Sequence, residues 1–286
     1  MEEKLSIREI KKEARSKLAQ KYPQTLISCF LFLAIIIGVD VILTSLLSLV
    51  AFNAIVGIIT TIFIIVITFP LSYGLVSLFL DYSRNTPAKA TDFINRAMLN
   101  FTNVCKTTSR LLLKLLKFFL IGVLASFIIL MCVVIAEENI IHPTAAQREV
   151  INNVSVAIVT IGYVLGIIGF YLPYSLSYYV LADNSESAGK ESLSISKNIL
   201  TGNIGKFILL YLSFLPYGLV IYLAEYLLNT YTQIQEIGAI VSLVGSILLM
   251  PYVLISVATF FDNIKGNLEP KKKKRGRNKK SEKESE

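Results

Sequence analysis

The sequence predicts an all-α, polytopic membrane protein with six transmembrane helices, and three observations support this fold class. Hydrophobic residues make up 54% of the chain and charged residues only 17%, unlike the composition of a soluble domain. The apolar residues form six runs, each longer than the roughly 20 residues that a helix needs to cross a bilayer. These runs do not alternate with period two, so they favour helices, which satisfy their own backbone hydrogen bonds in lipid, over a β-barrel.

The six predicted spans divide the chain into three parts. We expect a cytoplasmic amphipathic helix over residues 1–24, a membrane domain over 25–262 and a disordered polybasic tail over 263–286. The first span is too long for the apolar core of a removable signal peptide, so it is expected to remain as an anchor. Within the membrane domain the spans cover residues 25–50, 54–80, 111–136, 154–182, 207–228 and 237–261.

Lysine and arginine residues predict the orientation, because basic loops stay on the cytoplasmic side of a membrane. Seven of them precede the first span, and ten follow residue 261. The connections expected on the cytoplasmic side also contain these residues, with five in 81–110 and three in 183–206. The connections expected on the external side contain almost none, with one in 137–153 and none in 51–53 or 229–236. Both termini are therefore expected in the cytoplasm, with the spans in the plasma membrane.

A short amphipathic stretch leads into each odd-numbered span. In the first stretch, 6–22, Ser6 and Glu9 form a capping-box pattern, and the apolar face consists of Ile10, Ala14 and Leu18. The second and third stretches are 91–104, with Phe93, Ala97 and Phe101 at helical spacing, and 188–200, with Leu193 and the apolar positions of 195–200. Such helices are expected to lie in the headgroup region.

A proline inside an apolar run is followed three times, ten or eleven residues later, by an aspartate that ends the run: Pro70 with Asp81, Pro173 with Asp183, and Pro251 with Asp262. At about 1.5 Å per residue this spacing is half the thickness of the hydrocarbon core, so each proline is expected near the midplane. One amphipathic helix and two spans precede each aspartate. Since every unit contains two crossings, we predict three parallel repeats around an axis along the membrane normal.

The prolines and the aspartates of this element each allow two interpretations. Because proline removes a helix hydrogen bond, the kinks either shape a packed bundle, which we favour, or enclose a midplane cavity, as broken helices do in transporters. The carboxylates oppose the dipole at a helix C-terminus, so they need cationic partners, and Arg84 and Lys190 are close in sequence. We interpret the three aspartates as links between spans and interfacial helices rather than as ion ligands.

Two acidic residues lie inside the predicted spans. Asp40 lies within the first span, where a central aspartate costs roughly 2.5 to 3.5 kcal/mol on insertion scales, so it is a candidate for a functional role or for interhelical bonding. Glu225 lies near the external end of the fifth span and can reach water. The two acids could bind a cation or relay protons.

Several short motifs resemble a family of uncharacterised multi-pass membrane proteins of low-GC Gram-positive bacteria, defined by a domain of unknown function. The motifs are Leu-Ala-Asp at 181–183, the stretch 196–203, Leu-Ser-Phe at 212–214, Pro-Tyr at 251–252, Phe-Phe-Asp at 260–262 and the opening 7–18. A tryptophan commonly follows the Leu-Ser-Phe element in that family, whereas this chain contains none. The resemblance implies a membrane fold and location, and it carries no activity or catalytic residues.

The sequence offers little for an enzyme. His142 is the only histidine, and Cys29, Cys105 and Cys132 lack the spacing of metal ligands. We therefore predict no catalytic residue, cofactor or metal site. The basic run 271–274 with Arg275 and Arg277 follows a span, which indicates anionic lipid headgroups rather than nucleic acid as its partner.

Two functions fit these features. The leading prediction is a non-enzymatic accessory, protective or scaffold component that acts through lipids or a membrane-protein partner. The interfacial helices and the basic tail would contact anionic headgroups. The alternative is a transporter of small solutes or ions that uses a proline-kinked cavity with Asp40. A polar cavity that reaches Asp40 favours transport, and an apolar, filled centre favours the accessory role.

Overall fold

The computed structural model describes residues 5–48, 53–136, 144–232 and 235–265, and all regular elements in these ranges are helices. The long helices are α1 (Ile7–Leu47), α2 (Asn53–Ser83), α4 (Phe101–Ala136), α5 (Ala145–Phe170), α9 (Leu215–Thr232) and α10 (Gln235–Lys265). The shorter elements are α3 (Asp92–Leu99), the 3-10 turn η2 (Leu172–Tyr174), α6 (Ser177–Asp183), α7 (Lys190–Leu200) and α8 (Ile204–Leu212).

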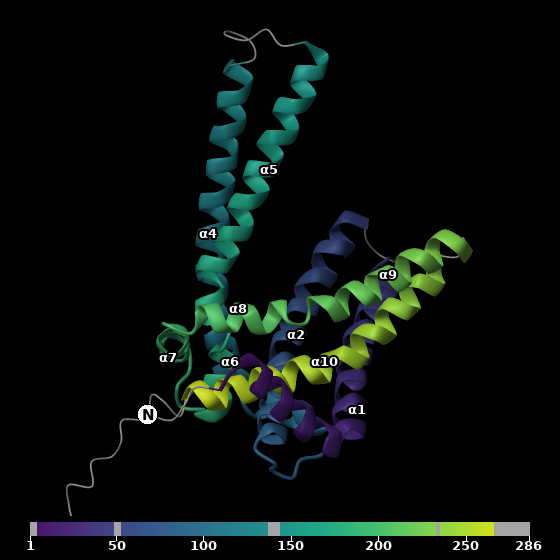
Figure 1. Cartoon of the computed structure of the whole chain (residues 1–286), viewed down its shortest axis with the longest axis vertical. Coiled ribbons are helices and arrows are strands. Elements are labelled where there is room, and N and C mark those ends of the chain that lie inside the picture. Colours follow the sequence, from purple (N-terminus) through teal and green to yellow (C-terminus); the bar gives the residue numbers. More distant parts are fainter. Residues whose placement is uncertain (1–4, 49–52, 137–143, 233–234, 266–286) are drawn as a thin grey trace, which may run out of the picture.

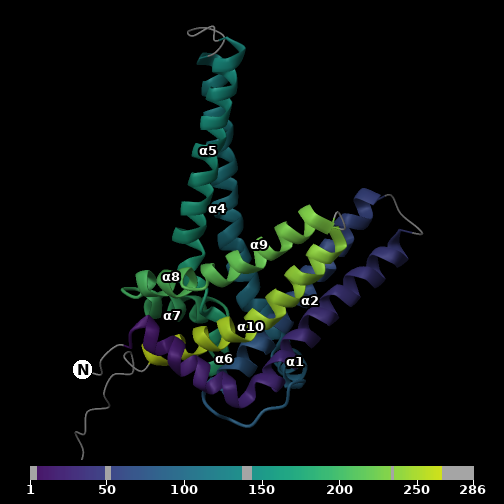
Figure 2. The same cartoon turned by 45° about the vertical axis from the view of Figure 1, so that its right-hand side comes forward.

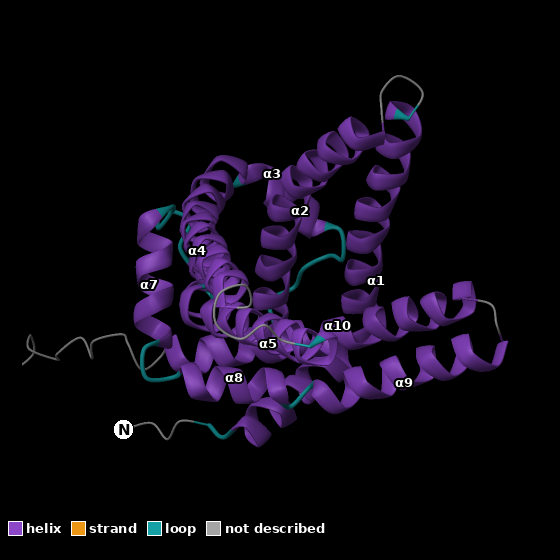
Figure 3. Cartoon of the chain, turned by 90° about the horizontal axis from the view of Figure 1, so that it is seen from above, coloured by secondary structure: helices purple, strands orange, loops and turns teal. Residues whose placement is uncertain are grey.

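Three helical hairpins diverge from a common base (Figures 1 and 3). The hairpins pair α1 with α2, α4 with α5 and α9 with α10. The base contains the first part of α1, the short helices α3, α6, α7 and α8, and the ends of α2 and α10. Figure 2 shows α1 changing direction between the base and its hairpin, and Pro23 lies inside this helix. A proline that removes a backbone hydrogen bond is a known cause of such a bend.

Five helical stretches in the described part of the chain are long and apolar enough to cross a membrane: Ile7–Leu47, Val56–Ser83, Phe101–Ile135, Ile204–Tyr231 and Glu236–Lys265. The predicted span 154–182 is not among them, and the chain there does not form one continuous helix. Helix α5 ends at Phe170, and η2 and α6 follow it. Pro173 lies in η2 and has no N–H group, which explains why the regular helix stops at this point.

The buried core lies in the base and not along the hairpins. Its largest fully buried side chains include Phe79, Phe93, Leu176, Phe207, Phe260 and Phe261, which come from four helices and from the turn before α6. In α4, by contrast, none of the most apolar 18-residue window is buried. The base therefore resembles the core of a globular protein, whereas the hairpins expose apolar surface that this chain does not cover.

The first part of α1 begins as the sequence indicates. The Ser6 hydroxyl accepts a hydrogen bond from the backbone N–H of Glu9 at 3.3 Å, and the Glu9 carboxylate accepts one from the N–H of Ser6 at 2.7 Å. This capping box satisfies two donors that the first turn of a helix leaves free. Ile10, Ala14 and Leu18 are all buried in the core of the base.

The second predicted amphipathic stretch is divided. Helix α3 ends at Leu99, and Asn100 is the C-cap before α4 begins. Phe93 and Ala97 are buried, as their spacing indicates, but Phe101 is 46% exposed. The predicted stretch 91–104 is therefore two helices, and the break at Asn100 separates Phe101 from the helix that carries Phe93 and Ala97.

Each segment that carries a repeated proline packs against a helix of the base. Helix α2 contacts α3, η2 and α6 contact α7, and α10 contacts the helix α1 that opens the chain. The hydroxyl of Ser196 in α7 donates to the carbonyl oxygen of Pro173 at 3.0 Å. Pro173 thus lies in the base, which differs from the expectation that all three prolines share the depth of the midplane.

Gly74 allows α2 and α3 to approach closely. A Cβ atom at this position would lie 2.0 Å from the backbone oxygen of Phe93 and 3.2 Å from the Cβ of Ala97. The first distance is far below van der Waals contact, and a backbone atom cannot rotate away as a side chain can. The position therefore requires glycine as long as the two helices keep this separation.

Replacing Gly74 by alanine is expected to lower the midpoint of thermal unfolding in detergent, because overpacking of this kind costs about 1 to 3 kcal/mol. Gly38→Ala is the matched control, since nothing lies within 4 Å of a Cβ atom at that helical position. The control should unfold at the wild-type temperature or slightly above it. Equal midpoints for the two variants would contradict the close approach of α2 and α3.

Candidate functional site

The three repeated aspartates come from helices that meet in the base. Asp81 lies in the last turn of α2, Asp183 is the last residue of α6, and Asp262 lies in the last turn of α10. Helix α2 contacts both α6 and α10. The convergence of these three helix ends brings together carboxylates that are far apart in the sequence.

Arg84 joins two of the carboxylates. It follows directly after α2, and its guanidinium lies 2.8 Å from Asp183 Oδ1. The same group donates to Asp262 from Nε at 3.1 Å and from Nη2. Asp262 also accepts a hydrogen bond from the Ser83 hydroxyl at 3.0 Å. One planar cation thus connects the ends of α2, α6 and α10.

Two further cations complete the cluster. Lys265 of α10 pairs with Asp183, and Arg96 of α3 pairs with Asp81. Arg96 also donates to the backbone oxygen of Ser77 at 3.1 Å, which fastens α3 along the last turns of α2. We call these six residues the aspartate cluster: Asp81, Asp183, Asp262, Arg84, Arg96 and Lys265. Its three carboxylates and three cations balance in formal charge.

The cluster shifts the ionisation of its central pair. Burial alone would raise the pKa of Asp183, but the hydrogen bonds from Lys265 and Arg84 outweigh it and leave this pKa below its ordinary value. Burial likewise works against the charge of Arg84, whereas its bonds to Asp262 and Asp183 raise the pKa of the guanidinium. Both groups are therefore held in their charged forms.

This arrangement is suited to joining helices rather than to ligating an ion. Each carboxylate has a protein cation as its partner. Within the described residues, no group of three or more His, Cys, Asp or Glu side chains could hold a metal ion. The partners of Asp183 are Arg84 and Lys265, and the expected partner Lys190 lies elsewhere, beside a cavity between α4 and α7.

A second set of cations, not anticipated from the sequence, packs on aromatic rings. The Lys11 ammonium lies 4.6 Å from the ring centre of Phe214 and donates to the Ser213 backbone oxygen at 2.9 Å. Arg15 donates to the hydroxyl groups of Tyr252 at 2.9 Å and Tyr217 at 3.0 Å. These cation–π and hydrogen-bond contacts attach the first part of α1 to α9 and α10. The sequence signal for them is the group of lysine and arginine residues that precedes the first predicted span.

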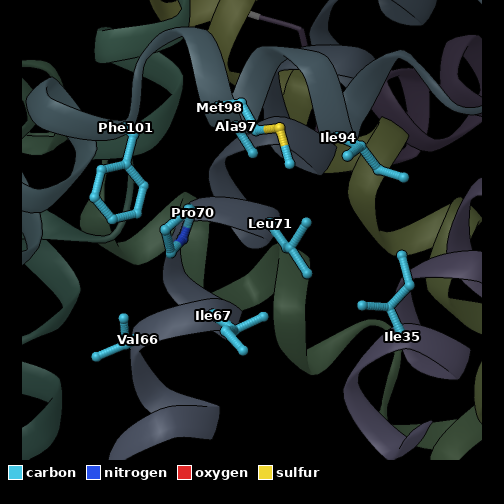
Figure 4. Close-up of a pocket in the computed structure, with 9 residues that line it drawn as sticks. All are labelled: Ile35, Val66, Ile67, Pro70, Leu71, Ile94, Ala97, Met98 and Phe101. Atoms are coloured by element: carbon cyan, nitrogen blue, oxygen red, sulfur yellow. The ribbon is translucent and has the colours of Figure 1, made fainter. Parts of the chain in front are cut away.

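Of the three repeated prolines, Pro70 lines an apolar cavity of about 330 Å³ between α1, α2, α3 and the start of α4 (Figure 4). Every lining residue is apolar, and Asp40 is not among them; they are Ile35, Val66, Ile67, Pro70, Leu71, Ile94, Ala97, Met98 and Phe101. Pro251 is buried within α10, and Pro173 lies in η2. This cavity is therefore not a chamber shared by the three prolines.

The two acids of the predicted spans lie apart from these features. Asp40 is exposed on α1, and Glu225 is half-buried on α9. They belong to different hairpins, and within the described residues neither forms an ion pair with the aspartate cluster. The structure thus brings together the repeated aspartates but not Asp40 and Glu225.

Apolar hairpins on an ion-paired base define an all-α protein with helices that could cross a membrane several times, which is the class of multi-pass membrane proteins. The chain belongs to the family described as "Protein of unknown function (DUF975)", whose model matches residues 1–268. This confirms the family resemblance seen in the short motifs. No curated protein and no solved structure matches the chain.

Replacing Asp183 by asparagine is expected to lower the midpoint of thermal unfolding, since hydrogen bonds to charged groups contribute about 1.5 to 3 kcal/mol. The pKa of Asp183 is lower in the folded protein than in the unfolded chain. The ionised carboxylate therefore stabilises the fold above the ordinary carboxyl pKa of about 3.9, and this stabilisation is lost as the pH falls from there through the folded pKa. Melting curves in detergent between about pH 3 and pH 7 should therefore converge for wild type and Asp183→Asn at the acid end. A constant difference across that range would contradict the ion pairing of Asp183.

Replacing Arg84 by lysine is expected to destabilise the protein although the charge is kept. An ammonium group is a point charge and cannot reproduce the fork that contacts Asp262 through two nitrogens and also reaches Asp183. The control is Lys89→Arg, because Lys89 is exposed and lies outside the cluster. Thermal unfolding should give a lower midpoint for Arg84→Lys and an unchanged one for Lys89→Arg, and a wild-type midpoint for Arg84→Lys would exclude the bridging geometry.

Proposed function

We propose that the protein is a non-enzymatic integral membrane protein of the plasma membrane that serves as an accessory or scaffold component. It acts through contacts that its hairpins make with membrane proteins or lipids. The observation that supports this proposal most directly is the apolar surface of the hairpins. Leu120, Ile121 and Leu124 of α4 are each more than half exposed, at 58%, 63% and 61%. Contiguous apolar surface of this extent needs lipid or other apolar helices to cover it.

The arrangement of the base supports three repeated units. Each unit would contain a base helix, a hairpin and a closing aspartate. The second helix of the first unit, α2, packs on α3, and η2 and α6 pack on α7; α10 then packs on α1, the helix that opens the first unit. Every unit therefore packs against the opening helix of the next unit, and the last unit packs against the opening helix of the first. A cyclic order of this kind is what parallel repeats around a central axis require.

The path of the chain supports an even number of crossings. The start of α1 and the end of α10 both lie in the base, and each hairpin leaves the base and returns to it (Figure 1). Six spans with both termini on one side agree with this path, provided that α5 crosses with its partner α4. The lysine and arginine distribution makes that side the cytoplasm.

The transport alternative has less support. It needs a polar cavity that connects the kinked helices with Asp40, and the cavity beside Pro70 is lined by apolar residues that do not include Asp40. The repeated aspartates, which could have served as ion ligands, have protein cations as partners. These observations favour the accessory role.

Cysteine labelling tests the six-span topology. In a variant with Cys29, Cys105 and Cys132 replaced, a single cysteine at Gln147 should react with a membrane-impermeant maleimide in intact cells. A single cysteine at Ser281 should react only after the cells are permeabilised, because six crossings with a cytoplasmic N-terminus leave the tail in the cytoplasm. Labelling of Ser281→Cys in intact cells would contradict this topology, since it would place the tail outside the cell.

Photo-crosslinking in native membranes tests the accessory role. A photoreactive residue at Leu124, which is 61% exposed on α4, should give a discrete adduct with a membrane protein that mass spectrometry identifies. The control position is Leu78, which is fully buried in the base and should give only products within the chain. If Leu124 gives no adduct beyond those of an unrelated membrane protein of equal abundance, a role through a membrane-protein partner on this face of α4 is wrong.

A further inference from the structure

A basic cavity lies where α4 leaves the base beside α7. Its volume is about 550 Å³, and five of its nine lining residues are cations: Arg110, Lys114 and Lys117 of α4, and Lys190 and Lys197 of α7. The spacing of the α4 residues, at i, i+4 and i+7, places them on one face of that helix, and Lys190 and Lys197 are likewise two turns apart. Two helix faces thus direct positive charge into one space. We call this space the α4–α7 cavity.

No carboxylate of the described residues balances the charge of the α4–α7 cavity. No aspartate or glutamate lines it, and none of its five cations forms an ion pair with a carboxylate of the described residues. The aspartate cluster, in the same base, pairs every carboxylate with a cation. Like charges on neighbouring turns repel, so an arrangement of five cations is unfavourable unless an anion occupies the space between them.

The remaining lining residues indicate which kind of anion fits. The Lys114 ammonium lies 3.6 Å from the ring centre of Tyr174, which holds this cation beside the cavity. Ser194 adds a hydroxyl group, whereas Leu113 and Leu193 add apolar surface. Lysine ammonium groups and a hydroxyl are suitable donors to the oxygens of a phosphate, and the leucines suit an apolar group attached to it.

The surface above the cavity continues as an apolar track. Ile121 and Ile128 follow Lys117 along α4 by four and eleven residues, so they lie on the helix face that carries the cations, and both are more than half exposed. A molecule that places a phosphate in the cavity could therefore lay a hydrocarbon chain along this helix. Inorganic phosphate would use the cations and leave the track uncovered.

We propose that the α4–α7 cavity binds the phosphate headgroup of an anionic glycerophospholipid, whose acyl chain lies along α4. This inference rests on the proposed membrane location of the protein and adds a defined site to it. The cations neutralise the phosphodiester, and the depth at which they lie on α4 fixes the hairpin relative to the headgroup layer.

The test uses the full chain reconstituted in nanodiscs of phosphatidylcholine that contain a minor fraction of phosphatidylglycerol. Lipid that remains bound after transfer to detergent is measured by native mass spectrometry. Wild type should retain phosphatidylglycerol in preference to phosphatidylcholine, and the variant Lys114→Gln/Lys190→Gln/Lys197→Gln should lose this preference by about tenfold or more. Loss of bound phosphatidylglycerol with rising salt is expected as well.

The matched control is Lys12→Gln/Lys89→Gln/Lys206→Gln, which removes the same number of charges outside the cavity. It should keep the lipid preference, and an equal loss in both triple variants would overturn the proposal in favour of general electrostatic attraction. The variant Lys114→Arg/Lys190→Arg/Lys197→Arg keeps the charges and should retain the lipid. If it also fails to bind while circular dichroism shows a folded protein, a site defined by these cations is excluded.

Two further experiments distinguish a lipid phosphate from a soluble one, and failure of the lipid site from failure of the proposed membrane location. Inorganic phosphate at about 10 mM, in large excess over the lipid, should not displace phosphatidylglycerol; displacement would assign the cavity to a soluble phosphate. Carbonate extraction of native membranes tests the location separately. Release from the membrane would overturn the proposed function, whereas a protein that stays in the membrane but shows no phosphatidylglycerol preference would overturn this inference alone.

Discussion

The guanidinium of Arg84 is the contact on which the base depends. It follows directly after α2 and reaches Asp183 at the end of α6 and Asp262 near the end of α10, so one side chain joins three helix ends. The hairpins have few buried contacts of their own, because their apolar side chains point outward. The relative placement of the helices is therefore determined in the base, by the packed aromatic core and by this charged junction above all. Hydrogen bonds from cations to partly buried carboxylates are directional. They therefore fix the relative orientation of the helices, which apolar packing alone does not determine.

The base holds two charged regions that differ in one respect. The aspartate cluster contains as many carboxylates as cations, whereas the α4–α7 cavity contains cations without carboxylates. Both lie at the foot of apolar hairpins, where a bilayer would change from hydrocarbon to headgroups. A junction with internal charge balance can hold helices together in any lipid. An unbalanced cavity makes the position of the α4–α5 hairpin depend on which lipid surrounds it.

The sequence predicted the class of fold because apolar runs and their length are local properties. The capping box of Ser6 and Glu9 and the buried face of Ile10 were visible for the same reason. The aspartates were recognised as needing cations, and Arg84 was named as a nearby one. Its pairing with Asp183 and Asp262 was not predicted, because these residues meet only through tertiary folding. The division of the span 154–182 depended on whether the chain beyond Pro173 packs against α7, which composition does not reveal. The same limit applies to Lys114 and Lys190, whose shared cavity is formed by two helices distant in sequence.

The position of Asp262 has a consequence for how the protein is made. Asp262 lies 178 residues after Arg84, so the ribosome completes almost the whole chain before the arginine can meet this partner. Until then Asp183 is the one carboxylate partner of Arg84 in the cluster that has been made. The contacts of α2 with α4 and α6 can therefore form before the last helix exists, whereas those of α10 with α1 and α2 cannot. The last helix to be synthesised is thus the one that connects the end of the chain to its beginning.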